Sequence, residues 1–192
     1  GKKWLSPDLG NIYMTICTEN DLSYAPASLI TGLICINSLS QLNESLKINL
    51  KWPNDIVMKN KKIGGILVEK EWIDERIKTI IGIGINLDIQ NIKNKEHWWG
   101  DLSMYDFKKK RNKLINLIIQ NFIKFYDKKT SWIDEWRHKC MHIDKEIEIY
   151  KDRALKKKAI FKDINLQGDA IIDTNMGTEI LRSGQINIKG IY

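Results

Sequence analysis

Cysteine, proline and histidine are scarce in this sequence, each occurring only three times among 192 residues. Cys17, Cys35 and Cys140 are far apart and odd in number, which argues against a disulfide framework and for a reducing compartment. No run approaches the roughly 20 apolar residues of a membrane span, and no secretory signal opens the chain. We therefore expect a cytoplasmic protein that has no membrane partner.

Motifs for metal binding and for covalent catalysis are also lacking. The segment 138–142 holds two histidines and one cysteine, but it lacks the paired spacing of a structural zinc site, so we interpret these as packing or surface residues. No Ser/His/Asp or Cys/His arrangement is visible. A catalytic function would therefore depend on positioning and on neutralising charge, without a covalent enzyme intermediate.

The charge balance does not point to nucleic acid. The formal net charge is +7, yet the 31 basic residues are interleaved with 24 acidic ones. The densest basic run, 108–113, opens a predicted helix and is expected to be its solvated end. We expect no nucleic-acid partner.

Hydrophobic residues make up 43% of the chain, which is enough for a core, and the length suits one medium domain and a small one. The segment 27–42 is apolar around most of its circumference and predicts a buried helix. A second predicted helix carries an apolar stripe that we expect to be core: Ile115, Ile118, Ile119, Phe122, Ile123 and Tyr126. Alternating apolar residues predict strands over 11–17, 46–52, 63–72 and 78–87.

The pattern of apolar and polar residues changes near residue 143. Short alternating runs separated by polar or glycine turns predict a small antiparallel barrel or meander. These runs are 146–150, 157–162, 169–173, 178–181 and 185–189. We accordingly expect two domains, 1–140 and 141–192, which pack together because no Pro/Gly linker separates them.

The stretch Lys51-Trp-Pro-Asn-Asp55 is the most informative part of the chain. Pro53 cannot donate to a strand ladder, so it ends the preceding strand and leaves Asp55 at a strand end. A hairpin back to the next strand brings Lys62 to the same mouth, beside the glycine pair 64–65. Two ammonium groups, one carboxylate and bare backbone suit an anionic ligand that also needs a metal, although a basic hairpin with a solvated turn shows the same pattern.

A second pattern favours a flat ligand. Gly82 and Gly84 lie on one face of the strand predicted at 78–87, and they leave a shallow floor with the Asn86 amide at its rim. The alternative is that these glycines allow close packing against another backbone.

Three blocks, Lys51–Asp55, Lys62–Glu69 and Ile81–Asn86, resemble in order and separation the signature blocks of biotin protein ligases (BirA-type biotin–[acetyl-CoA-carboxylase] ligases). The segments 3–7 and 11–13 match the same family. The resemblance implies an α+β fold: a mixed β-sheet with helices on one side, as in class II aminoacyl-tRNA synthetases and biotin ligases, followed by a small SH3-like β-barrel. It also implies that the catalytic domain is incomplete at its N-terminus, because Gly1 matches the end of a loop that covers the ligand in the family.

The activity implied by the resemblance is an ATP-dependent ligation. Biotin is converted with ATP and Mg²⁺ to biotinyl-5′-AMP, and the biotinyl group passes to one lysine of a biotin carboxyl carrier domain. A homodimer is compatible with the family. The alternatives are a lipoate-type ligase of the same fold and a non-catalytic module that only binds carrier domains, because the covering loop is absent.

The site residues implied by the resemblance fall into overlapping groups. The catalytic set is Lys62, Lys51 and Asp55, with Asp55 also proposed to bind Mg²⁺. The expected biotin slot is lined by Tyr13, Lys62, Gly65, Ile66 and Gly82. The expected ATP-binding residues are Lys51, Asn54, Asp55, Lys62, Asn86, Trp99 and Lys189. Lys189 replaces an arginine of the family, so it keeps the charge but loses the forked geometry.

Overall fold

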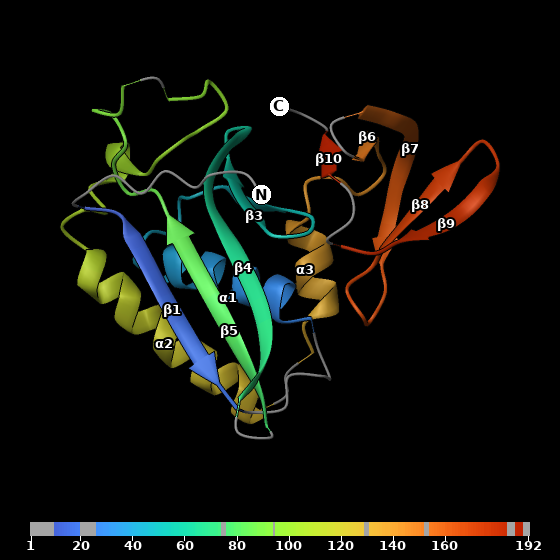
Figure 1. Cartoon of the computed structure of the whole chain (residues 1–192). Coiled ribbons are helices and arrows are strands. Elements are labelled where there is room, and N and C mark those ends of the chain that lie inside the picture. Colours follow the sequence, from blue (N-terminus) through green and yellow to red (C-terminus); the bar gives the residue numbers. More distant parts are fainter. Residues whose placement is uncertain are drawn as a thin grey trace.

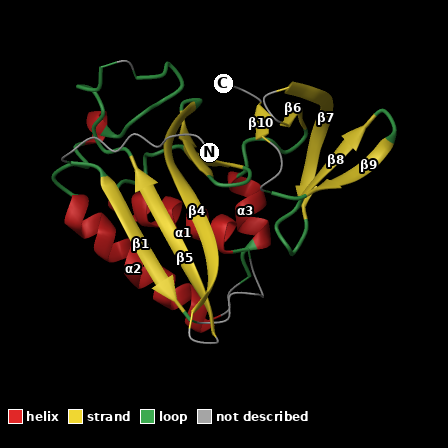
Figure 2. Cartoon of the chain, viewed as in Figure 1, coloured by secondary structure: helices red, strands yellow, loops and turns green. Residues whose placement is uncertain are grey.

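The structure, a computed structural model, describes residues 10–19, 26–73, 76–93, 95–128, 131–151, 154–183 and 187–189. Two antiparallel sheets and a group of helices make up this part of the chain (Figures 1 and 2). None of its helices combines the length and the apolar character that crossing a membrane requires.

The first sheet has the strand order β1-β5-β4-β3-β2, and neighbouring strands are antiparallel. Its strands are β1 (Ile12–Thr18), β2 (Ile48–Lys51), β3 (Asp55–Met58), β4 (Lys61–Ile73) and β5 (Arg76–Ile85). Among the described residues, parallel contacts are limited to two isolated bridges, Leu50 with Cys140 and Lys62 with Trp99. The apolar alternation of the sequence fixes which face is buried, and Ile81, Ile83 and Ile85 of β5 point into the core.

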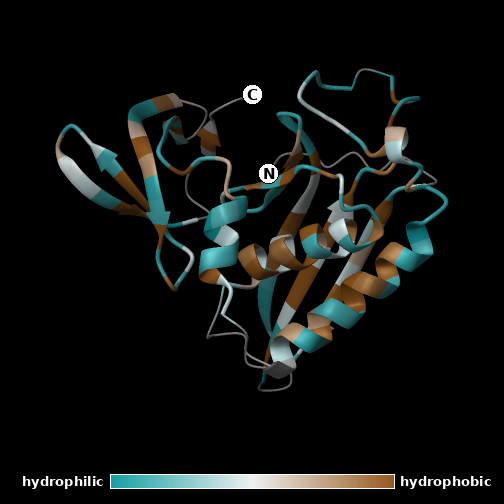
Figure 3. Ribbon diagram, turned by 180° about the vertical axis from the view of Figure 1, so that it is seen from behind, coloured by the Kyte–Doolittle hydropathy of each residue, from teal (hydrophilic) through white to brown (hydrophobic). Residues whose placement is uncertain are grey.

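The helices cover one face of this sheet, as predicted (Figure 1). Helix α1 (Ala27–Leu42) has the predicted bounds, begins after Pro26 and packs on β2, β3 and β4. Helix α2 (Arg111–Lys128) lies beside α1 and contacts it (Figure 3), so that α1 is covered on a second side, which suits its largely apolar circumference. Both faces of α1 are therefore buried by other elements.

The core stripe predicted for α2 is partly wrong. The buried positions recur at every fourth residue, namely Leu114, Ile118, Phe122 and Tyr126. In contrast, Ile119 and Ile123 are 40% and 54% exposed. The helix packs beside α1, and the side that carries Ile119 and Ile123 is turned outwards, so the face that it buries is narrower than the apolar pattern suggests.

The predicted hairpin from strand 46–52 to strand 63–72 is also wrong in one respect. An additional short strand, β3, lies between β2 and β4 and pairs with both. The chain reverses twice, first through 52–54 and then through Lys59 and Asn60, which both have positive φ values of 50° and 58°. A two-residue turn of this kind suits the twist of a hairpin, and Asn tolerates the left-handed conformation.

The second sheet corresponds to the predicted small antiparallel barrel or meander and has the order β10-β6-β7-β8-β9. Its strands are β6 (Lys145–Lys151), β7 (Ala154–Ile164), β8 (Ala170–Thr174), β9 (Gly177–Leu181) and β10 (Asn187–Lys189). The residue expected to open the last of these strands, Gln185, lies outside the described residues. The division into domains at residue 140 stays a prediction.

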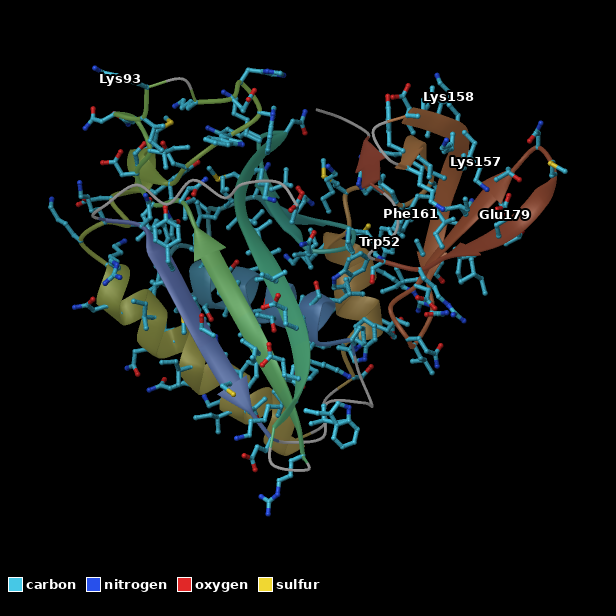
Figure 4. All side chains as sticks on the ribbon, viewed as in Figure 1. Trp52, Lys93, Lys157, Lys158, Phe161 and Glu179 are labelled. Carbon is cyan, nitrogen blue, oxygen red and sulfur yellow. The ribbon has the colours of Figure 1, made fainter. Side chains whose placement is uncertain are left out.

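Contacts of Trp52 and of Arg137 join the first sheet and its helices to the second sheet. Trp52, which is 1% exposed, donates its indole N–H to the carbonyl of Gly168 at 2.8 Å and lies against Phe161, with ring centroids 6.4 Å apart (Figure 4). Helix α3 (Ile133–Lys139) adds a bidentate ion pair, in which Arg137 contacts both oxygens of Asp163 at 2.6 and 2.8 Å. A short 3-10 turn, η1 (Ser103–Tyr105), completes the described elements.

Candidate functional site

A single row of residues crosses all five strands of the first sheet. Directly opposed pairs connect Lys51 to Asp55, Asp55 to Gly65, Gly65 to Gly84, and Gly84 to Tyr13. Directly opposed residues share one face of a sheet, so the side chains of Lys51, Asp55 and Tyr13 project on the face that the helices leave uncovered. We call these five residues the site row. The middle of the row, Gly65 and Gly84, has no side chains. The charged side chains lie at one end of the row and the phenol of Tyr13 at the other.

The next row on this face extends the floor. Gly82 lies between Leu67 and Thr15 in the strand register. A Cβ at Gly82 would lie 3.6 Å from the Cβ of Leu67, an ordinary contact distance, so packing does not require this glycine. A flat ligand, in contrast, needs the space that the missing side chain leaves. Tyr13 is 38% exposed at the edge of this floor, and partial burial raises the pKa of its phenol, while the Asn11 side chain lowers it.

Charge is concentrated at the β2–β3 end of the site row. The Nζ of Lys62 lies 2.5 Å from Oδ1 of Asp55, and the Nζ of Lys51 lies 4.0 Å from Oδ2. The three side chains are only 19%, 8% and 17% exposed for Lys62, Lys51 and Asp55, so water screens them incompletely. Two ammonium groups against one carboxylate leave a net positive charge of about one, which favours an anionic ligand.

A β-bulge places Lys62 on the site face. Opposed pairs run from Ile56 with Gly64 directly to Val57 with Lys62, so Ile63 is the extra residue in β4. Without the bulge, the two-residue period would put Lys62 on the core face with Gly64. The bulge therefore reverses the direction of Lys62 and brings its ammonium to Asp55.

A loop segment borders Lys62 on the side away from β3. The N–H of Lys62 donates to the carbonyl of Trp98 at 2.8 Å, and the N–H of Gly100 donates to the carbonyl of Lys62 at 2.8 Å. Trp99, assigned to ATP binding by resemblance, bridges Lys62 between them and contacts Trp98 edge to face, with ring centroids 5.6 Å apart. Both indoles are half-buried. Two half-buried indoles thus lie on the loop segment whose backbone is hydrogen-bonded to Lys62.

Asn86 holds this loop. Its side-chain amide donates to the carbonyl of Gly100 at 3.0 Å, and its backbone carbonyl accepts from Leu102 at 3.1 Å. The amide N–H₂ group is thereby directed at the loop backbone. The expectation that Asn86 contacts a nucleotide stays a prediction.

Asn54 and Ile66 form two hydrogen bonds with each other. The side-chain amide of Asn54 donates to the carbonyl of Ile66 at 2.7 Å, and the N–H of Ile66 donates to the carbonyl of Asn54 at 2.9 Å. The Ile66 side chain is 2% exposed and faces the core, opposite to Gly65. Any part of Ile66 in the slot is therefore limited to its backbone, and both of its backbone polar groups lie against Asn54 or the neighbouring strand.

Lys189 is not joined to the cluster by a described contact. Its backbone lies in β10, opposite Glu148, in the second sheet. The position of its side chain lies outside what the structure describes. The assignment of Lys189 to ATP therefore stays a prediction.

Asp55 is the residue expected to bind Mg²⁺. No group of three or more His, Cys, Asp or Glu side chains suited to a metal occurs within the described ranges. Mg²⁺ is commonly bound by one or two carboxylates together with substrate phosphates, so a single carboxylate beside two ammonium groups fits that pattern. The Asp55 carboxylate would have to share its contact with Lys62 to do so.

Gly84, which the sequence places on the floor together with Gly82, belongs to the site row. Sequence reasoning gave no role at the site to two other residues, Gly100 and His142, because their importance depends on neighbours that are distant in the sequence. His142 is fully buried without a described hydrogen-bond partner for either ring nitrogen, and it lies near Lys51 and Asp55.

Comparison with known proteins agrees with this geometry. Residues 1–86 match the Biotin/lipoate A/B protein ligase family. The bifunctional ligase/repressor BirA of Escherichia coli is 27% identical over 206 residues, which cover 96% of this chain and 63% of that protein. The corresponding protein of Bacillus subtilis is 31% identical over 90 residues, covering 45% and 28% of the two chains. The chain thus spans less than two thirds of the length of these relatives.

Solved structures extend the likeness to the fold. The biotin protein ligase of Aquifex aeolicus in complex with biotin and ATP superimposes with a TM-score of 0.77 at 25% identity, covering 98% of this chain and 82% of that one. The enzyme of Leishmania major in complex with biotinyl-5-AMP gives a TM-score of 0.60 at 20% identity, covering 95% and 82%. Both alignments run through the first and the second sheet.

Proposed function

We propose that this chain, whose residues 1–86 match the Biotin/lipoate A/B protein ligase family, is a biotin protein ligase that activates biotin with ATP and transfers it to a lysine of a biotin carboxyl carrier domain. One observation supports the chemistry above all. Two partly buried ammonium groups, Lys51 and Lys62, flank one carboxylate at the charged end of a glycine-floored face. Such a cluster allows two anions, a carboxylate and a phosphate, to approach each other.

In the first step, a carboxylate oxygen of biotin attacks the α-phosphorus of ATP. The new bond is the acyl–phosphate bond of biotinyl-5′-AMP, and the bond to the β-phosphate oxygen breaks, so that pyrophosphate leaves with the electron pair. Lys62 neutralises the charge that gathers on the carboxylate and on the α-phosphate as they meet. Asp55 holds the Lys62 ammonium in place before the substrates bind.

In the second step, the ε-amine of the acceptor lysine attacks the acyl carbon of the anhydride. An amide bond forms, AMP leaves, and the amine loses its extra proton to solvent. Lys51 lies at the same end of the site row and stabilises the departing phosphate. Tyr13, Gly65 and Gly82 border the flat part of the slot, where biotin would lie.

The finer assignments belong to the same proposal. Mg²⁺, held by Asp55 and the ATP phosphates, would supply further neutralisation of phosphate charge. The acceptor is a biotin carboxyl carrier domain, and assembly is a homodimer. The cytoplasm suits the requirement for ATP and the free thiols of Cys17, Cys35 and Cys140.

Product analysis tests this function directly. The chain is incubated with ATP and Mg²⁺ and with either biotin or lipoate, and pyrophosphate and the acyl-adenylate are quantified; a carrier domain is then added and its lysine is analysed by mass spectrometry. Biotinyl-AMP and a biotinylated lysine are expected. Lipoyl-AMP in place of biotinyl-AMP would identify a lipoate ligase, and carrier binding without any adenylate would identify a docking module.

A further inference from the structure

The Trp98–Gly100 loop takes over a strand position next to β4. Strand β5 pairs with β4 as far as Ile85 opposite Gly64, and the N–H of Asn86 still donates to the carbonyl of Ile63 at 2.7 Å. Beyond that point β5 turns away. The two backbone bonds that Lys62 makes with the loop continue the ladder in its place.

This support acts at the point where β4 is least regular. The bulge at Ile63 interrupts the ladder between β3 and β4 beside Lys62. A bulged strand is held less firmly by its partner and can change its local twist, which would redirect the side chain. The loop bonds on the opposite edge therefore fix the backbone of Lys62, and with it the direction of the ammonium towards Asp55.

Gly100 is what lets the loop approach so closely. A Cβ at this position would lie 2.8 Å from the Cβ of Lys61 and 3.2 Å from Cγ2 of Ile63. Its backbone is not in the left-handed region, so the requirement is closeness rather than conformation. The side-chain amide of Asn86 then donates a hydrogen bond to the carbonyl of Gly100 at 3.0 Å.

We propose that Gly100 and Asn86 are positioning residues that set the Lys62 ammonium by clamping the Trp98–Gly100 loop against the bulge in β4. This inference rests on the proposed function, because it assigns Lys62 a role in adenylate formation. Its consequence is that the loop and the charge cluster act as one unit. A nucleotide base that stacks on the indoles of the loop would steady Lys62 through two backbone hydrogen bonds.

The principal test is Gly100→Ala. We expect kcat for adenylate formation to fall about 10- to 100-fold, the scale of a misplaced group in a preorganised site, with a much smaller change in KM for biotin. Addition of Gly100→Ala to Lys62→Met should then cause no further loss, because Gly100 acts through Lys62. Losses that multiply in the double variant would overturn the proposal.

A rescue experiment separates positioning from general damage. Lys61→Gly removes the nearest atom that the new methyl group meets, and Lys61 is exposed and has no place in the site row. Lys61→Gly alone should keep wild-type kcat, and combined with Gly100→Ala it should restore most of the lost rate. Asn86→Ala removes the side-chain hydrogen bond to the carbonyl of Gly100. Like Gly100→Ala, it should lower kcat much more than it changes KM for biotin.

Amide hydrogen exchange gives a readout that does not need activity. In Gly100→Ala, we expect the amide of Lys62 to exchange at least about tenfold faster, because its bond to Trp98 opens, while Lys61→Gly leaves it protected. An unchanged Lys62 amide would refute the clamp even if the rate falls. A wild-type chain that makes no adenylate would refute the proposed function instead, and the exchange result would still decide whether the loop holds Lys62.

Discussion

The ammonium of Lys62 lies 2.5 Å from Oδ1 of Asp55, and the two side chains are 19% and 17% exposed. The two groups form an ion pair in partly buried surroundings. The pair joins β4 to β3 at the charged end of the site row, with Lys51 on the far side of the carboxylate. The cluster is therefore set before any ligand binds, which is the condition for electrostatic catalysis without reorganisation.

The first prediction concerns the charge of Lys62. Lys62→Met should lower the rate of adenylate formation at least ~100-fold, the usual scale for loss of one preorganised charge stabiliser. Pyrophosphate release with saturating biotin and ATP measures it. The matched control is Lys61→Met, one residue earlier and exposed. Near-native turnover of Lys62→Met would remove Lys62 from the mechanism.

Two glycines in the first sheet should respond in opposite ways to alanine. At Gly64 a Cβ would lie 2.6 Å from the carbonyl oxygen of Gly84, so Gly64→Ala should lower the free energy of unfolding by about 1–3 kcal/mol. At Gly82 the contact is an ordinary 3.6 Å, so Gly82→Ala should keep its stability but bind biotin more weakly, because the methyl group stands on the floor of the slot.

Urea denaturation and calorimetric titration with biotin distinguish these two effects. If Gly82→Ala bound biotin as well as the wild type, the flat ligand would not lie on this floor. If Gly64→Ala were as stable as the wild type, the close approach of β4 and β5 would not be a constraint.

The buried His142 predicts how stability depends on pH. Burial, and to a smaller extent the charges of Lys51 and Lys145, lower the pKa of this imidazole to about 4, and the charge of Asp55 opposes this shift. The unfolded chain, with a histidine pKa of about 6.5, binds the proton more readily, so stability is lost as the pH falls from about 6.5 towards 4. At pH 7 this histidine does not reduce the free energy of unfolding. The full reduction at low pH is on the order of 3 kcal/mol.

His142→Phe tests this directly. The ring contact with Phe161, whose centroid is 5.7 Å away, can be kept, while both unpartnered nitrogens are removed. The variant should be at least as stable as the wild type at pH 7 and should lose much less stability between pH 6.5 and 4.5 in urea titrations. Parallel curves for the two proteins would mean that another group carries the acid sensitivity.

The contact between the two sheets predicts the effect of Trp52→Phe. The change removes the N–H that reaches Gly168 at 2.8 Å and leaves a buried carbonyl without that donor. We expect a loss of about 1–3 kcal/mol in the free energy of unfolding. Trp72→Phe is the control, since Trp72 is 75% exposed and its replacement should stay within about 0.5 kcal/mol. Equal stability of the two variants would argue against a stabilising indole bond.

The sequence predicted the elements with strong periodicity better than it predicted their local details. Helix α1 has the expected bounds, and strands β1 and β5 lie where the alternation predicts them, because the apolar period is unambiguous over their length. Strand β3 was missed, since its four residues are too few to show a period and directly follow Pro53. The exposure of Ile119 depends on which element α2 meets, and local sequence does not contain that information.

At the candidate site, too, the sequence predicted some features and not others. Lys51, Asp55 and the glycines are recognisable from their spacing, and the register brings them into one row. The direction of Lys62 depends on the bulge at Ile63, which strict alternation would not predict. The orientation of Ile66 into the core and the attachment of Asn86 to Gly100 follow from pairings between segments that are separated in the chain.

The site row contains one residue from every strand of the first sheet, so no strand can detach while the row survives. Catalytic capacity should therefore vanish in a single step together with the cooperative melting of this sheet, and partial activity should not persist in a fragment that lacks an edge strand. The order of the strands makes the proposed activity a direct gauge of whether the framework of the first sheet is whole.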